Sequence, residues 1–268
     1  MALIRSIIHM LWMASTVVPY TLAILLASLL GLRGEPVYRI ARAWLALSVN
    51  SARPLLGIQY RVSGMEHLPK DAQGGAVLLV KHQSTYETFL MPAIMPRPLA
   101  YVFKKELLYV PFFGWSIGRL DMIHIDRSAR ARAFVKVVQQ GRALLAKGTW
   151  VIMFPEGTRV ERGQKGQYKN GGTRLAIDTG APVIPIAVTS AKVWPRKAFI
   201  KRPGVVDVSI GQPIPTAGRQ SDELMREVEA WIEAEMRRLD PEAYSDTATP
   251  VSPAAAQPPA PADASDGL

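Results

Sequence analysis

Short apolar runs recur through the middle of the chain and predict its architecture. Six of them, rich in Val, Ile and Leu, are typical of buried strands: 76–80, 99–103, 121–125, 150–154, 183–188 and 205–210. Apolar residues at helical spacing predict helices at 85–94, 129–147, 172–179 and 221–239. Continuous apolar strands separated by helices favour an α/β fold with a mixed, largely parallel sheet that helices cover on both faces.

An uncharged stretch near the start of the chain predicts association with a membrane. Met10 to Leu32 contains 23 residues without a charge. As a helix, such a stretch reaches about 30 Å, enough to cross the hydrocarbon core of a bilayer. A cleavable signal peptide is the competing interpretation, but its apolar region is normally about 7 to 15 residues long. No convincing small-x-small cleavage site follows Arg33. A buried core helix of this length at the end of a soluble domain is the weaker alternative.

Residues 35–56 form a second, amphipathic helical segment. Its arginines, Arg39, Arg42 and Arg53, stand beside apolar residues, which suits a helix at the level of the lipid headgroups. Only Arg5 precedes the uncharged stretch, whereas several arginines follow it. This bias places the rest of the chain at the cytoplasmic face of the membrane. A spanning helix and a helical hairpin on one face of the membrane both give this sidedness.

The charge of the chain is unevenly distributed. Residues 1–240 hold 32 basic and 18 acidic side chains, a net charge of +14, whereas residues 241–268 hold four acids, six prolines and no Lys or Arg. We expect this tail to be disordered, because its few large apolar residues do not offset the entropy of ordering. The predicted domains are membrane-associated helices at 1–57, an α/β domain at 58–240 and the tail.

The basic region needs an anionic partner. Anionic membrane lipids, phosphorylated substrates and acidic carrier proteins all satisfy the charge argument. No zinc-finger, RNP-like or basic-zipper pattern is present, so nucleic acid is not an expected partner. The chain has no cysteine, which excludes disulfides and a cysteine nucleophile. Its four histidines lack a two-His helical spacing, and we expect no metal and no cofactor.

A histidine directly after the apolar run 77–80 is the first candidate for chemistry. His82 is followed five residues later by Glu87, and a His beside a carboxylate is the minimal general-base pair. Residues five apart in one helix lie about 140° apart, so His82 must precede the helix and Glu87 must lie in its first turn. Ser84 and Glu87 also fit a capping box, in which the Glu reaches back to a free backbone N–H. This block alone leaves both interpretations open.

A second polar block follows the predicted strand at 150–154. In Phe-Pro-Glu-Gly-Thr-Arg, Pro155 stops the strand, Gly157 permits unusual backbone angles and Arg159 offers a planar fork of donors suited to a phosphate. An ordinary polar turn is the alternative. Both blocks lie beyond the ends of strands, where catalytic and binding residues of such sheets are expected.

The blocks at 82–87 and 154–159 together resemble the glycerolipid acyltransferase family, which is marked by His-x4-Asp followed some seventy residues later by Phe-Pro-Glu-Gly-Thr. The resemblance covers about residues 65–215, because further family blocks follow in the expected order: Lys-Lys-Glu-Leu at 104–107, Ile-Asp-Arg at 125–127, Lys-Asn-Gly-Gly at 169–172 and Ala-Pro-Val-Ile-Pro-Ile at 181–186. One departure is that Glu87 stands where the family usually has Asp. Related bacterial sequences resemble this variant, which keeps the charge and adds one methylene.

The resemblance implies a reaction. A fatty acyl group would pass from acyl-CoA or acyl carrier protein to the sn-2 hydroxyl of 1-acylglycerol 3-phosphate (lysophosphatidic acid), giving phosphatidic acid. The implied general base is His82, oriented by Glu87, and no covalent acyl-enzyme is required. The acyl carrier is a co-substrate rather than a cofactor.

The resemblance also implies an acceptor site. Arg159, with Lys105 and Arg127, is expected to hold the phosphate of the acceptor. Glu156 and Gly157 are expected to shape the glycerol pocket, and Thr158 belongs to the same substrate-binding turn.

Three alternatives remain beside this reaction. The chain could acylate another lysophospholipid, including by transacylation, because most of these lipids also carry a phosphate. It could be a non-catalytic protein that binds membrane surfaces. It could also be a hydrolase in which His82 activates water.

Overall fold

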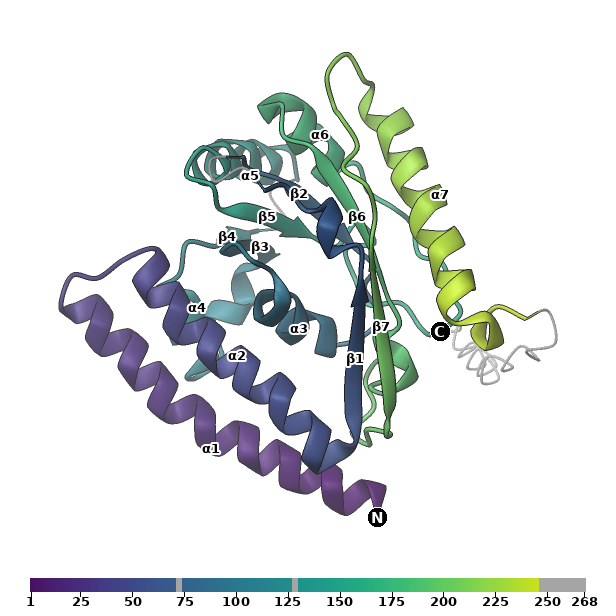
Figure 1. The fold of residues 1–268 in the computed structure, drawn as a ribbon. Coiled ribbons are helices and arrows are strands. Elements are labelled where there is room, and N and C mark those ends of the chain that lie inside the picture. The colour runs from purple at the N-terminus through teal and green to yellow at the C-terminus, as the bar shows by residue number, and fades with distance from the viewer. Residues whose placement is uncertain (71–73, 127–129, 246–268) are drawn as a thin grey trace, which may run out of the picture.

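A seven-stranded sheet forms the centre of the computed structural model, which describes residues 1–70, 74–126 and 130–245 (Figure 1). Its strands are β1 (Ile58–Ser63), β2 (Val77–Val80), β3 (Leu99–Lys104), β4 (Ile123–Ile125), β5 (Trp150–Met153), β6 (Val183–Val188) and β7 (Gly204–Ile210). They lie in the order β1-β7-β6-β2-β5-β3-β4, and every neighbouring pair is parallel except β6 and β7. The predicted mixed, largely parallel sheet is confirmed.

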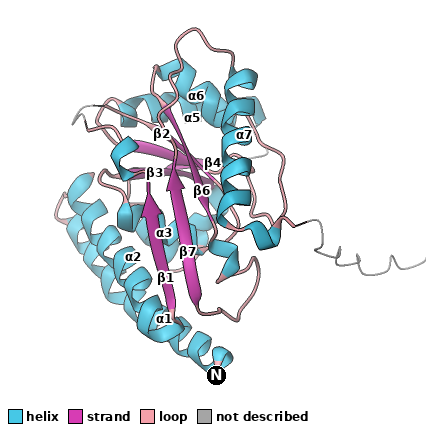
Figure 2. Cartoon of the chain, turned by 45° about the vertical axis from the view of Figure 1, so that its right-hand side comes forward, coloured by secondary structure: helices cyan, strands magenta, loops and turns pink. Residues whose placement is uncertain are grey.

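Helices cover both faces of the sheet (Figures 1 and 2). The described α-helices are α1 (Ala2–Leu29), α2 (Glu35–Leu56), α3 (Tyr86–Ile94), α4 (Phe113–Ile117), α5 (Arg130–Leu145), α6 (Gly171–Thr179) and α7 (Ser221–Leu239). One apolar core lies between the sheet and α2 and α3, and a second lies between the sheet and α5, α6 and α7. Helix α1 packs on the outer side of α2.

Strand β2 is buried on both sides because it lies in the middle of the sheet. Its residues alternate between the two cores: Leu78 and Val80 belong to the first and Val77 and Leu79 to the second. This two-sided burial explains why the strand is apolar without a break.

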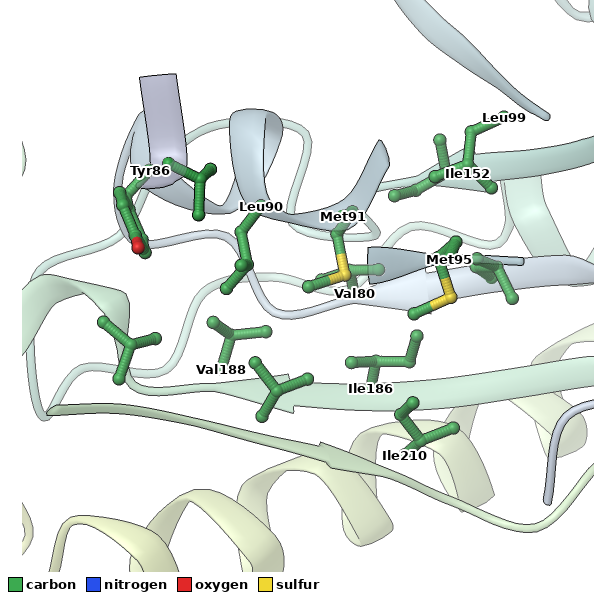
Figure 3. Close-up of a cluster of buried hydrophobic side chains, with 14 of the residues drawn as sticks. Val80, Tyr86, Leu90, Met91, Met95, Leu99, Ile152, Ile186, Val188 and Ile210 are labelled. Atoms are coloured by element: carbon green, nitrogen blue, oxygen red, sulfur yellow. The ribbon is translucent and has the colours of Figure 1, made fainter. Parts of the chain in front are cut away.

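Helix α3 begins only a few residues after β2 and packs back onto the same strands. Tyr86, Leu90 and Met91 on α3 lie over Val80 of β2 and Val188 of β6 (Figure 3). The loop between β2 and α3 is therefore held at both of its ends by buried packing.

Helix α1 lies along the domain instead of projecting from it. Arg5 donates to the carbonyls of Pro54 and Leu55 at the end of α2, and the Thr21 hydroxyl lies 2.8 Å from that of Ser116 in α4. Among the described helices, α1 is the one long and apolar enough to cross a membrane, which is weak evidence for membrane association. Its outer face exposes large apolar side chains, including Ile4, Ile8, Leu11, Trp12, Leu22 and Leu26.

The predicted strands, the second N-terminal helix and the helices of the α/β domain are present, with ends within two residues of the predicted ones. The uncharged stretch differs, because α1 begins at Ala2, eight residues before Met10, and ends at Leu29, three residues before Leu32. Strand β1 was missed because it is an edge strand: Gln59, Tyr60 and Arg61 are exposed, so it lacks an apolar run. The domain boundaries stay predictions. Residues Pro241–Ala243 form a short 3-10 helix, and the remainder of the tail, 246–268, lies outside the described residues.

Candidate active site

The carboxyl ends of β2, β5 and β3 meet at one edge of the sheet, and the sequence blocks singled out above follow these ends. His82 follows β2, the turn 155–159 follows β5, and Lys104 ends β3. A cavity of about 1010 Å³ lies there, lined by these segments and by side chains of α1 and α2. Most of its lining is apolar, and His82 and Arg159 are among its polar groups.

His82 and Glu87 contact each other as predicted. The Nδ1 atom of His82 lies 2.8 Å from Oε1 of Glu87. The same oxygen accepts the backbone N–H groups of Gln83 at 2.8 Å and Ser84 at 2.7 Å, which marks it as an acceptor. Nδ1 is therefore the protonated nitrogen of the neutral ring, and Nε2 carries the lone pair. His82 lines the cavity, and none of the hydrogen bonds among the described residues involves its Nε2 atom.

The capping interpretation and the pairing describe one geometry. Glu87 reaches back to the N–H of Ser84, while the Ser84 hydroxyl accepts the N–H of Tyr86 at 3.1 Å. The helix begins at Tyr86, one residue later than predicted. The turn that starts the helix thus also brings the carboxylate to His82.

The ring of His82 is held from a second side. Phe154 stacks on the imidazole with ring centroids 3.8 Å apart and planes 15° apart. The backbone N–H of His82 donates to Oε2 of Glu156 at 2.9 Å, and its carbonyl accepts the N–H of Val160 at 2.8 Å. The turn after β5 therefore fixes both the ring and the backbone of His82.

Glu156 is turned into the protein interior. Its side chain is fully buried, and Oε1 accepts Nζ of the equally buried Lys81 at 2.8 Å. Lys81 also donates to Glu233 of α7 at 2.6 Å. Burial raises the pKa of Glu156, and the charge of Lys81 opposes this rise. Glu156 is absent from the described lining of the cavity, so its contacts are those of a residue that positions the turn and His82.

Gly157, Thr158 and Arg159 do line the cavity. Gly157 has a φ of 65°, and a Cβ at this position would lie 3.1 Å from Nζ of Lys169. Arg159 donates from Nη1 to the Thr85 hydroxyl at 2.6 Å. The turn needs glycine both for its backbone conformation and because the Lys169 side chain passes so close.

Lys169 is a cavity residue to which the sequence assigned no role. It lies in the block at 169–172, its backbone N–H donates to Pro155 O at 2.9 Å, and its side chain lines the cavity. No described residue forms a hydrogen bond or ion pair with its ammonium group. The family block was the available signal, but the contact with Gly157 depends on the fold.

Lys104, the last residue of β3, and Lys105, which follows it, differ in their surroundings. Lys104 lines the cavity, whereas Lys105, the predicted phosphate ligand, forms an ion pair with Asp126 and is absent from the described lining. The hydrogen bond to Asp126 and the negative charge of that residue raise the pKa of Lys105, and burial opposes this rise. Arg127, the other predicted ligand, lies outside the described residues. Within the part of the chain that is described, no cluster of three potential metal ligands occurs.

Comparison with known proteins agrees with the family resemblance of the sequence. The acyltransferase family model matches residues 59–189. A 1-acyl-sn-glycerol-3-phosphate acyltransferase of Pseudomonas aeruginosa is 40% identical over 243 residues, which cover 89% of this chain and 92% of that protein. One of Saccharomyces cerevisiae is 29% identical over 82% of this chain and 72% of the relative.

A solved structure shares the fold. The crystal structure of the 1-acyl-sn-glycerophosphate (LPA) acyltransferase PlsC from Thermotoga maritima matches with a TM-score of 0.73 at 24% identity, over 90% of this chain and 98% of that one. At this identity the similarity shows a common fold.

Proposed function

This chain belongs to the 1-acyl-sn-glycerol-3-phosphate acyltransferase family, and from this membership and the geometry of the site we propose the reaction that it catalyses. A fatty acyl group passes from acyl-CoA or acyl carrier protein to the sn-2 hydroxyl of 1-acylglycerol 3-phosphate, giving phosphatidic acid. The observation that carries the proposal is His82, with Nδ1 bonded to buried Glu87 and with its side chain lining a large apolar cavity.

In the proposed mechanism His82 is the general base. Nε2 takes the proton of the acceptor hydroxyl while the hydroxyl oxygen attacks the thioester carbonyl carbon. The C–S bond then breaks, and the proton passes to the leaving thiolate. Glu87 keeps Nδ1 protonated and stabilises the imidazolium, and a base of this kind contributes roughly 10²- to 10⁴-fold.

The acceptor phosphate is proposed to bind at the cationic rim of the cavity. Arg159 and Lys169 flank Gly157, and both side chains are exposed, so an anionic headgroup reaches them without losing all of its water. Arg159 supplies a planar fork of donors and Lys169 a point charge. Thr158 stands between Gly157 and Arg159 on the same turn. By resemblance, Lys105 and Arg127 complete the acceptor site.

The apolar part of the cavity is proposed to hold acyl chains. Its walls include Ile24 of α1, Trp44 of α2 and Phe89 of α3. Burial of such chains against apolar walls contributes about 0.8 kcal/mol per methylene. Because α1 and α2 form part of the wall, a lipid in the cavity contacts the same helices that carry the exposed apolar face.

We place the enzyme at the cytoplasmic face of a bacterial inner membrane. The exposed apolar face of α1 suits insertion among acyl chains, and the contacts of α1 with the domain favour a helix that lies on the membrane. The positive charge of residues 1–240 favours anionic membrane lipids as partners.

The test is an acylation assay with the full chain in phosphatidylglycerol vesicles. The acyl donor is acyl-CoA or acyl carrier protein with an isotope-labelled acyl group. The acceptor is lysophosphatidic acid, lysophosphatidylethanolamine or lysophosphatidylglycerol, and the products are identified by mass spectrometry. Labelled phosphatidic acid is expected. If another labelled diacyl lipid is the preferred product, the acceptor is the corresponding lysophospholipid and not lysophosphatidic acid. Labelled free fatty acid would indicate a hydrolase. The absence of product with either donor would favour a non-catalytic binding protein.

A further inference from the structure

A serine far from His82 in the sequence contacts the carboxylate behind it. The hydroxyl of Ser190 donates to Oε2 of Glu87 at 2.5 Å, across a sequence separation of 103 residues. Ser190 lies just after β6, at the start of a short 3-10 helix (Ser190–Lys192). Both Ser190 and Glu87 are fully buried.

The two oxygens of Glu87 have different kinds of partner. Oε1 accepts three donors, the His82 ring and the N–H groups of Gln83 and Ser84, all from the loop that leads into α3. Oε2 accepts Ser190, the one donor to it among the described residues. The local loop therefore holds one oxygen, and the segment that follows the neighbouring strand β6 holds the other.

Packing fixes the position of Ser190 relative to Glu87. Strand β6 lies beside β2, and the backbone N–H of Lys81 donates to Ile186 O at 2.9 Å. Figure 3 shows Leu90 of α3 above Val188, which lies two residues before Ser190, and Tyr86, the neighbour of Glu87, belongs to the same helix and the same apolar core. The same apolar core therefore positions both Ser190 and the start of α3.

The turn that contains Ser190 does not need its hydroxyl. The N–H groups of Val193 and Trp194 donate to the backbone carbonyl of Ser190, at 3.3 and 3.0 Å. A change to alanine keeps these bonds. It leaves a buried carboxylate oxygen without a donor from the described residues, a strongly unfavourable state that rotation of the carboxylate would relieve.

We infer that Ser190 is a positioning residue that acts on His82 through Glu87. Its hydroxyl fixes the rotation of the carboxylate so that Oε1 stays aligned with Nδ1 of His82. Ser190 touches neither the reacting atoms nor the cavity lining among the described residues. The effect on rate rests on the proposed function, whereas the effect on the hydrogen bond between His82 and Glu87 does not.

A double-mutant cycle tests the effect on rate. Ser190→Ala is expected to lower kcat about 10-fold while KM for the acceptor stays within about 2-fold, because the substrate does not contact Ser190. In a Glu87→Gln background the same change is expected to have almost no further effect. Ser48→Ala is the matched control, since Ser48 is also buried, at 4% exposed, and its hydroxyl donates within its own helix, to Trp44 O. An unchanged kcat, or an equal loss in both backgrounds, would overturn the inference.

The second readout needs no substrate. In protein labelled with ¹⁵N-histidine, the Nδ1 proton bonded to Glu87 is expected to give a downfield NMR signal that His82→Ala removes. Ser190→Ala is expected to abolish or broaden it, and Ser48→Ala to retain it. A signal that persists unchanged in Ser190→Ala overturns the inference, even if acyl transfer is confirmed. Loss of the signal in an otherwise folded protein supports it, even if acyl transfer is refuted.

Discussion

The ring of Phe154 lies almost parallel to the imidazole of His82 and covers one of its faces. Since Nδ1 is bonded to Glu87 and the backbone N–H to Glu156, the ring is restrained in its rotation, its tilt and its height above the sheet. The two blocks on which the family resemblance rests therefore meet in a single stack of side chains.

Replacing Phe154 with leucine removes the flat ring and keeps most of its apolar volume. We expect kcat to fall roughly 3- to 10-fold, the range that corresponds to an aromatic pair, with little change in KM. Steady-state kinetics of Phe154→Leu measure this. Phe199→Leu is the control, because Phe199 is exposed and absent from the described cavity lining. Wild-type kcat in Phe154→Leu would show that the stack is irrelevant to the base.

Replacing Lys169 with methionine removes a charge from the rim and keeps the length of the side chain. We expect KM for lysophosphatidic acid to rise roughly 10- to 100-fold, because a charge-assisted contact with phosphate is lost, while KM for the acyl donor stays the same. Lys165→Met is the control, since Lys165 pairs with Glu229 on the surface. An unchanged KM for the acceptor, or an equal rise for the donor, would contradict the assignment of Lys169.

The buried carboxyl of Glu156 makes stability depend on pH. Burial raises its pKa above the ordinary value of 4.5, so the folded state holds the proton more tightly than the unfolded state. This contribution to stability is fully present below pH 4.5 and is lost as pH rises through the folded pKa. Glu156→Gln removes the titration.

Urea unfolding of wild type and Glu156→Gln, from below pH 4.5 to above the folded pKa, measures how the free energy of unfolding of each depends on pH. The stability of the variant relative to wild type is expected to improve with rising pH, whatever the fixed cost of losing the contact with Lys81. A difference that is constant with pH, or that changes in the opposite direction, would show that Glu156 has no raised pKa.

The exposed face of α1 is predicted to attach the protein to lipid. Ile8 and Leu11 are 48% and 59% exposed, and burial of a charge at either site in a bilayer is costly. Ile8→Glu/Leu11→Glu is expected to reduce flotation with phosphatidylglycerol vesicles about 10-fold or more, without a change in circular dichroism. Gln140→Glu, on the exposed side of α5, is the control. Undiminished flotation of the double variant would exclude α1 as the attachment.

Much of the fold was predictable because the central strands are buried on both faces. The pair of His82 and Glu87 was also predictable, since a loop and one helical turn bring the residues together locally. The partners that come from other strands were not. Ser190 and Lys169 reach the site only because the sheet places β6 and β5 on either side of β2, an order that the alternation of strands and helices does not encode.

The cavity was not predictable either. Its walls combine α1 and α2 with β3 and the segment that contains α4, and these elements contribute apolar residues that a sequence pattern assigns simply to a core or a membrane. The charge pattern likewise did not distinguish Lys105, which is paired with Asp126, from Lys104, which lines the cavity.

The proposed mechanism depends on His82 as the base in acyl transfer to lysophosphatidic acid. The most direct measurement is the rate at which His82→Ala forms labelled phosphatidic acid, with vesicle binding measured on the same sample and His67→Ala as the control outside the described cavity lining. A fall of roughly 10²- to 10⁴-fold with unchanged vesicle binding is predicted. Phosphatidic acid formed by His82→Ala at the wild-type rate would show that His82 is not the base.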